Sequence, residues 1–216
     1  TSRGGGFYAE NSTVTLQASV VSGNSTNGTN GVGGAIASYG SVVTLSGNTI
    51  VNLNSTLGSQ APGGAIYMSG GSLNVANAQF AQNSTSGLLA SGGAIALVGG
   101  ASANISNAAF VQNSVAGSGS HGGAIYHVGS GNTPGTVTIR NSLIADNVVT
   151  NAQSNGGGVY SDTNLSGTQK TSIINSTVSG NSAPHRGGGV YNADGVTEIL
   201  HSTISNNSAR LMKRGS

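Results

Sequence analysis

A pair of adjacent glycines recurs seven times along this chain at a nearly constant interval. Each pair opens a short motif that ends in an apolar residue, as in "GGAIY" at 63–67 and again at 122–126. The copies begin at Gly4, Gly33, Gly63, Gly92, Gly122, Gly156 and Gly187. Their spacings are 29, 30, 29, 30, 34 and 31 residues, which covers nearly all of the 216-residue chain. A fixed period in this range indicates a repeat architecture.

A second motif keeps the same interval, with an apolar residue three positions before an asparagine. The apolar members are Val21, Val51, Phe80, Phe110, Ile144, Val178 and Ile204. The asparagines are Asn24, Asn54, Asn83, Asn113, Asn147, Asn181 and Asn207. The register of the second copy is open, because Ile50 could take the place of Val51. Another asparagine column precedes the apolar one and ends in two other residue types: Ala18, Asn48, Asn77, Asn107, Asn141, Asn175 and His201.

The segments between the glycines predict strands. Helical repeats need amphipathic stretches of 10–15 residues rich in Leu, Glu and Lys. Here the apolar runs are short and alternate with polar residues, as in "TVTL" at 13–16 and "TVTI" at 136–139. We therefore expect a single all-β domain over residues 1–216, a parallel β-helix of about seven coils of roughly 30 residues each.

Stacking of equivalent residues gives each motif position a physical role. The fourth position of the glycine motif is always apolar and should point inward. The glycines fit a sharp bend, or a place where a β-carbon would meet the next coil. Asparagine tolerates a left-handed backbone, and amides stacked at the strand spacing can bond along the axis. The seven asparagines of the second motif are thus predicted to form a structural ladder.

Composition excludes several classes of protein. Charged residues make up 6% of the chain and the net charge is +2, with no basic patch of the kind that binds nucleic acid. There is no cysteine, which excludes disulfides and thiolate metal sites. No apolar run approaches the length of a membrane span. We expect no cofactor.

The acidic residues and histidines form no recognisable catalytic pattern. Five acids are present: Glu10, Asp146, Asp162, Asp194 and Glu198. Asp162 and Asp194 each follow a "GGGVY" motif and could approach each other on adjacent coils, as a weak cation site or as solvated loop carboxylates. The four histidines fall at different repeat positions without metal-ligand spacing. We predict no catalytic, metal or cofactor residues.

Tyrosines occupy the position after the inward apolar residue. Five of the six tyrosines in the chain stand in this column: Tyr8, Tyr67, Tyr126, Tyr160 and Tyr191. Alternation along a strand points them outward. They could form a surface-recognition stripe for a glycan or a protein. They could equally serve as cross-strand packing that the following loop half covers.

The pairing of the two motifs resembles a known repeat family. "GGAI" at 63–66 with "FAQN" at 80–83, and "GGAI" at 92–95 with "FVQN" at 110–113, are similar to the repeats of the chlamydial polymorphic outer-membrane proteins. Copies one, six and seven carry "GGG" instead and resemble secreted bacterial β-helix proteins more broadly. The resemblance implies a right-handed parallel β-helix displayed extracellularly or on a bacterial outer surface, often as the adhesin passenger of an autotransporter.

These observations favour a non-catalytic adhesin or surface-fibre segment. We expect either a slice of a longer array or a protomer that stacks end to end, because no cap residues are evident at either end. Its partners would be other copies of itself, or a surface protein or glycan of a host or neighbouring cell. A polysaccharide-binding or polysaccharide-degrading domain is the alternative. Ice binding ranks lower, since Asn74 and Asn104 interrupt a column that Thr15, Thr44 and Thr138 begin.

Overall fold

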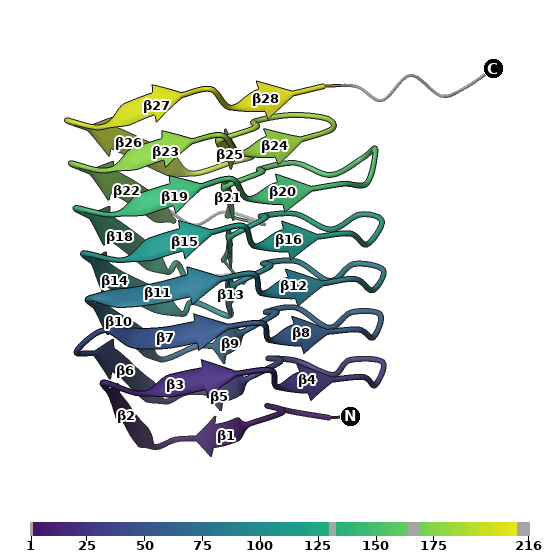
Figure 1. The fold of residues 1–216 in the computed structure, drawn as a ribbon, viewed down its shortest axis with the longest axis vertical. Coiled ribbons are helices and arrows are strands. Elements are labelled where there is room, and N and C mark those ends of the chain that lie inside the picture. The colour runs from purple at the N-terminus through teal and green to yellow at the C-terminus, as the bar shows by residue number, and fades with distance from the viewer. Residues whose placement is uncertain (1, 130–132, 164–168, 211–216) are drawn as a thin grey trace.

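The chain forms a parallel β-solenoid. The computed structural model describes residues 2–129, 133–163 and 169–210. Within these ranges 28 strands form four parallel sheets of seven strands each. Each coil gives one strand to each sheet, and successive coils stack along one axis (Figure 1). The predicted all-β solenoid with coils of about 30 residues is confirmed. None of the described residues belongs to a helix that is long and apolar enough to cross a membrane.

Two sheets carry the longer strands. Sheet I follows the glycine motif and contains β1 (Phe7–Glu10), β5 (Ile36–Tyr39), β9 (Ile66–Ser69), β13 (Ile95–Val98), β17 (Ile125–Val128), β21 (Val159–Asp162) and β25 (Val190–Asn192). Sheet II contains β2 (Thr13–Gln17), β6 (Val42–Ser46), β10 (Ser72–Ala76), β14 (Ser102–Ser106), β18 (Thr136–Arg140), β22 (Lys170–Ile174) and β26 (Val196–Leu200).

The second motif lies across the other two sheets. Sheet III contains β3 (Val20–Ser22), β7 (Thr49–Asn52), β11 (Ala78–Ala81), β15 (Ala109–Val111), β19 (Leu143–Ala145), β23 (Thr177–Ser179) and β27 (Thr203–Ser205). Sheet IV contains β4 (Ser25–Thr26), β8 (Ser55–Thr56), β12 (Ser84–Thr85), β16 (Ser114–Val115), β20 (Val148–Val149), β24 (Ser182–Ala183) and β28 (Ser208–Ala209).

The register of the sheets aligns the repeat positions as predicted. Ile66 pairs with Ile95, and Phe80 pairs with Phe110. Val51 pairs with Phe80 and is fully buried, which settles the open register of the second copy in favour of Val51 over Ile50. The inward columns meet in one apolar core that extends along the axis. Inside it, the Phe80 and Phe110 rings stack with centroids 4.7 Å apart.

The two glycines of the motif are required for different reasons. The first takes a left-handed backbone, with φ of +77° at Gly63 and +75° at Gly92. The second lies against the next coil: a Cβ on Gly93 would stand 2.2 Å from the carbonyl oxygen of Gly123. The two explanations offered by the sequence therefore both hold, each for one glycine of the pair.

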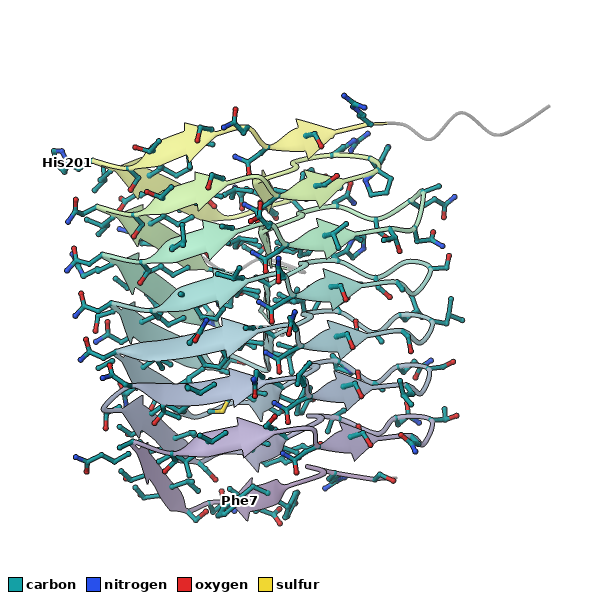
Figure 2. The ribbon with its side chains drawn as sticks, viewed as in Figure 1. Phe7 and His201 are labelled. Atoms are coloured by element: carbon teal, nitrogen blue, oxygen red, sulfur yellow. The ribbon has the colours of Figure 1, made fainter. Side chains whose placement is uncertain are left out.

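The core columns reach solvent at the two ends of the solenoid. Phe7 is 45% exposed in the first described coil, although Ile36, its neighbour in the same column, is completely buried. Ile199 and Ile204 in the last coil are 41% and 47% exposed for the same reason. Figure 2 places Phe7 at one end of the stack and His201 at the other. Each end thus presents apolar side chains that an additional coil would cover.

Candidate functional site

The predicted asparagine ladder is formed along the whole stack. Each Nδ2 donates a hydrogen bond to Oδ1 of the equivalent asparagine in the next coil. The donor–acceptor distances are 3.0 Å for Asn24–Asn54, 3.0 Å for Asn54–Asn83, 3.0 Å for Asn83–Asn113, 2.9 Å for Asn113–Asn147, 2.8 Å for Asn147–Asn181 and 2.9 Å for Asn181–Asn207. The ladder residues of the five internal coils are completely buried.

Each internal amide uses all of its hydrogen-bonding capacity. Oδ1 of Asn113 accepts from both the backbone N–H and Nδ2 of Asn83, each at 3.0 Å. Its Nδ2 donates to the Phe80 carbonyl at 3.0 Å and to Oδ1 of Asn147 at 2.9 Å. A buried amide with four partners carries no desolvation penalty from unpaired groups. The ladder therefore fixes the coil register from inside the core.

The other asparagine column has a different role. Its members take a left-handed backbone, with φ between +47° at Asn175 and +65° at Asn48, and they turn the chain into sheet III. Their side chains are exposed. Ala18 and His201, which end the column, take the same conformation at +48° and +51°. The sequence offered a left-handed backbone and axial bonding as joint reasons for asparagine. The left-handed backbone belongs to this corner column alone, whereas the continuous row of axial bonds belongs to the buried ladder; the corner column has a single axial bond among its described residues, from Asn175 to Asn141.

The predicted tyrosine stripe is aligned but largely covered. Tyr126 pairs with Tyr160, and Tyr160 pairs with Tyr191. Tyr8 is 41% exposed, whereas Tyr160 is 8% exposed, and Tyr67, Tyr126 and Tyr191 are half-buried. Ring centroids lie 5.3 Å apart for Tyr126–Tyr160 and 5.6 Å apart for Tyr160–Tyr191. The rings of Tyr126, Tyr160 and Tyr191 thus pack against one another along the axis, and this packing covers part of their faces.

The tyrosine outside the column, Tyr39, fills a gap in the stripe. The column holds Ala37 between Tyr8 and Tyr67, and this alanine is completely buried. The Tyr39 ring lies 5.8 Å from Tyr8 and 5.6 Å from Tyr67, so it bridges the interruption. The motif did not indicate this contact, because Tyr39 comes two residues after the tyrosine position. Recognition of a ligand by the stripe remains a prediction.

One histidine stacks on the stripe at its C-terminal half, and a second is linked to the first through Asn155. The His121 ring stacks on Tyr160 with centroids 4.5 Å apart, and its Nδ1 accepts the backbone N–H of Asn155 at 3.1 Å. The His185 Nδ1 lies 3.0 Å from Oδ1 of the same asparagine. Burial lowers the pKa of His121, and burial with the Asp162 charge raises the pKa of Tyr126 to about 12. The neutral forms of His121 and Tyr126 are therefore favoured near neutral pH.

The acidic side chains make local contacts. Glu10 and Asp162 each accept a hydrogen bond from the tyrosine two residues before them, Tyr8 and Tyr160, both at 3.0 Å. Asp194 accepts from Oγ1 of Thr163 at 2.8 Å, which lowers its pKa. Asp146 stands at a left-handed turn, with φ of +55°. The described residues contain no group of three or more histidines and carboxylates that could hold a metal ion.

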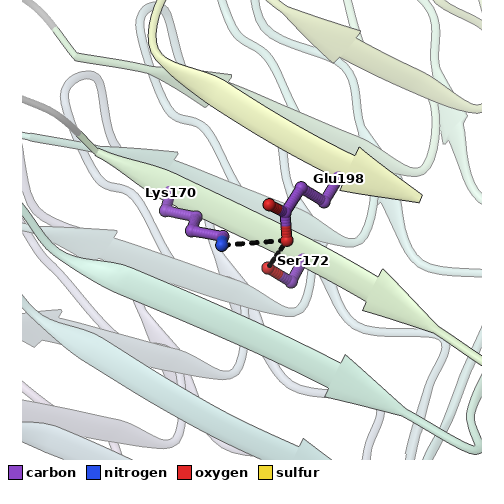
Figure 3. Close-up of polar contacts among 3 residues, drawn as sticks. All are labelled: Lys170, Ser172 and Glu198. Carbon is purple, nitrogen blue, oxygen red and sulfur yellow. Dashed lines mark hydrogen bonds and ion pairs between the residues drawn. The ribbon is translucent and has the colours of Figure 1, made fainter. Parts of the chain in front are cut away.

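The outward face of sheet II carries uncharged polar residues over most of its length. The central column reads Thr15, Thr44, Asn74, Asn104, Thr138, Ser172 and Glu198. At the C-terminal end of this face, Lys170 Nζ and Glu198 Oε2 form an ion pair at 2.9 Å (Figure 3). The Ser172 hydroxyl donates to the same carboxylate oxygen at 3.4 Å. The interruption of the threonine column, expected from the sequence, leaves no regular threonine array on this face.

A buried histidine, His127, was not identified by the sequence motifs. It follows the tyrosine position, points inward, and is 1% exposed. Its Nδ1 lies 3.0 Å from Oγ1 of Thr171, which in turn lies 3.0 Å from Oγ of Ser161. Nε2 has no hydrogen-bond partner among the described residues. Burial lowers the pKa of His127 to about 4. Strand alternation from the inward Ile125 was the signal that could have revealed it.

This histidine predicts a stability that depends on pH. The unfolded chain protonates His127 near pH 6.5, whereas the folded chain protonates it only near pH 4. The free energy of unfolding should therefore fall by about 3 kcal/mol as the pH drops from 6.5 to 4, and His127 should contribute no further loss below that. Urea titrations at several pH values would measure it. In His127→Leu, which copies Leu97 of the preceding coil, this component should vanish; an unchanged pH slope would contradict the assignment.

No protein-family model, curated protein or solved structure matches the chain.

Proposed function

We propose that this chain is a non-catalytic segment of a bacterial cell-surface or secreted β-solenoid, which serves as an adhesin passenger or as a fibre that stacks end to end. The observation that carries the proposal is the state of the two ends. Phe7, Ile199 and Ile204 belong to columns whose members in the internal coils are buried, yet each of the three is more than 40% exposed. A further coil of the same repeat, supplied by another copy, would bury them.

The ladder supports the same proposal. Its Nδ2 donors all point toward the C-terminal coil, so Asn24 offers Oδ1 at one end and Asn207 offers N–H groups at the other. The two ends are complementary. The motif resemblance adds the expectation of a right-handed helix, an extracellular or outer-surface location, and a surface protein or glycan of another cell as partner. The local contacts of the carboxylates favour this reading over a polysaccharide-degrading enzyme.

Electron microscopy and sedimentation of the purified chain test the stacking. We expect rods whose length grows with concentration. Phe7→Glu and Ile204→Glu each place a charge in an apolar end face, and each should hold the chain at its monomer mass of 21.0 kDa. Leu88→Glu is the matched control, since Leu88 is 51% exposed in a turn of an internal coil, away from both ends. A wild-type chain that stays monomeric at every concentration would overturn the fibre proposal.

A further inference from the structure

A groove of about 570 Å³ runs beside sheet III across four coils. One wall is the column of left-handed corner asparagines: Asn48, Asn77, Asn107 and Asn141. The floor holds the small side chains of Ala78 and Ala108, which are 6% and 5% exposed. The opposite wall consists of outward residues of sheet III: Ile50, Gln79, Ala109 and Leu143. None of the lining residues is charged.

The corner amides in this groove are available to a ligand. Asn48, Asn77 and Asn107 make no side-chain hydrogen bond within the part of the chain that the structure describes. Asn141, at the far end of the groove, accepts a bond from Nδ2 of Asn175 at 2.7 Å. The left-handed corner does not by itself require an amide, because Ala18 and His201 adopt it as well. The side-chain amides of Asn48, Asn77 and Asn107 are therefore the ones that a ligand in the groove could bond.

We propose that this groove binds an extended, uncharged polysaccharide strand that lies along the solenoid axis. This inference rests on the adhesive role proposed above and names its ligand class. An amide both donates and accepts, which matches the sugar hydroxyl. The side chains of Ile50, Ala109 and Leu143 offer apolar surface to the C–H faces of the rings. The amides repeat at the coil spacing of about 4.8 Å, close to the length of one pyranose unit in an extended chain.

The absence of charge in the groove argues for a neutral glycan over an acidic one. The lining offers neither Arg nor Lys to a carboxylate or sulfate, and a desolvated anion without a counter-charge is costly. The tyrosine stripe is a weaker candidate for the same ligand, because its ring faces are occupied by neighbouring rings. Sugars usually stack on a free aromatic face. The groove has no aromatic residue in its lining and offers amides and aliphatic side chains instead.

Titration of the isotope-labelled chain with soluble oligosaccharides tests the proposal by NMR. The probes are the neutral hexamers of β-1,4-linked glucose, mannose, xylose and N-acetylglucosamine, with oligogalacturonate as the acidic comparison. At least one neutral hexamer should shift the side-chain amide signals of Asn48, Asn77 and Asn107. The double variant Asn77→Gly with Asn107→Gly keeps the left-handed corners but removes two amides, and should weaken binding roughly tenfold or more.

His201→Gly is the matched control, since it changes the same column outside the groove (Figure 2) and should leave affinity unchanged. Thermal unfolding of all variants checks that the fold is retained. The proposal is overturned if none of the neutral hexamers binds at millimolar concentration, if the acidic oligomer binds as well as they do, or if the double variant binds normally. Failure here leaves rod formation untouched, and monomeric behaviour in the stacking test leaves glycan binding measurable.

Discussion

Asn113→Ala is expected to lower the free energy of unfolding by about 4 kcal/mol, because it leaves one buried N–H without a partner and removes three further buried hydrogen bonds. Among the described residues, Oδ1 of Asn113 is the only acceptor of the Asn83 backbone N–H. The substitution removes it together with the amide donor to the Phe80 carbonyl. Nδ2 of Asn83 keeps its hydrogen bond to the Val51 carbonyl. Oδ1 of Asn147 keeps the hydrogen bond that it accepts from the Asn113 backbone N–H. One orphaned N–H, at about 1–3 kcal/mol, and three further lost hydrogen bonds, at about 0.5–1.5 kcal/mol each, set the expected size.

Urea denaturation followed by circular dichroism would measure this loss. The matched control is Asn107→Gly, an exposed asparagine of the same coil that makes no ladder bond; its effect should stay within about 0.5 kcal/mol. If Asn113→Ala cost less than about 1 kcal/mol, the ladder would be a result of coil stacking and would not stabilise the stack.

Gly93→Ala should cost about 3 kcal/mol or more through steric overlap between coils. The new Cβ would stand 2.2 Å from the Gly123 carbonyl oxygen and 2.7 Å from the Ser114 carbonyl oxygen. Both atoms are backbone, so neither can rotate away. Relief requires the next coil, which carries Gly123, to separate, and also a shift of Ser114, which lies across the same coil. Hydrogen exchange should therefore show loss of protection centred on the strands around Gly93 and Gly123.

Gly28→Ala provides the comparison for this substitution. Its added Cβ would meet nothing nearer than the Ser2 hydroxyl at 3.5 Å, an ordinary van der Waals contact, and its backbone is not left-handed. Its effect should be close to zero or slightly stabilising. Equal destabilisation by the two alanines would show that loss of glycine flexibility, and not the close approach of coils, explains the motif.

The repeat made most of the fold predictable. A period near 30 with short alternating runs leaves few architectures, and equivalent residues then face equivalent surroundings. The inward position of Ile66, the ladder role of Asn83 and the two alternative reasons for the glycines all follow from that periodicity. Which glycine of the pair makes the left-handed bend and which lies against the next coil depends on the geometry of neighbouring coils, and this could be read only from the structure.

Features that depart from the repeat were harder to predict. Tyr39 lies outside the tyrosine column, and its ring reaches across Ala37 because the alanine there leaves space. His127 stands in a column that holds Met68 and Leu97 in earlier coils, so only alternation marks it as buried. The groove depends on the combination of small floor residues with exposed corner amides, which no single motif position displays.

The uniform direction of the ladder gives the molecule an electrical axis. Every amide dipole in it is oriented alike, from Oδ1 facing the N-terminal coil to Nδ2 facing the C-terminal coil. Aligned hydrogen bonds in a low-dielectric interior polarise one another and strengthen as the row lengthens. A filament made of such units would have two unlike tips, and subunits could join it in one orientation only, so growth at one tip need not match growth at the other.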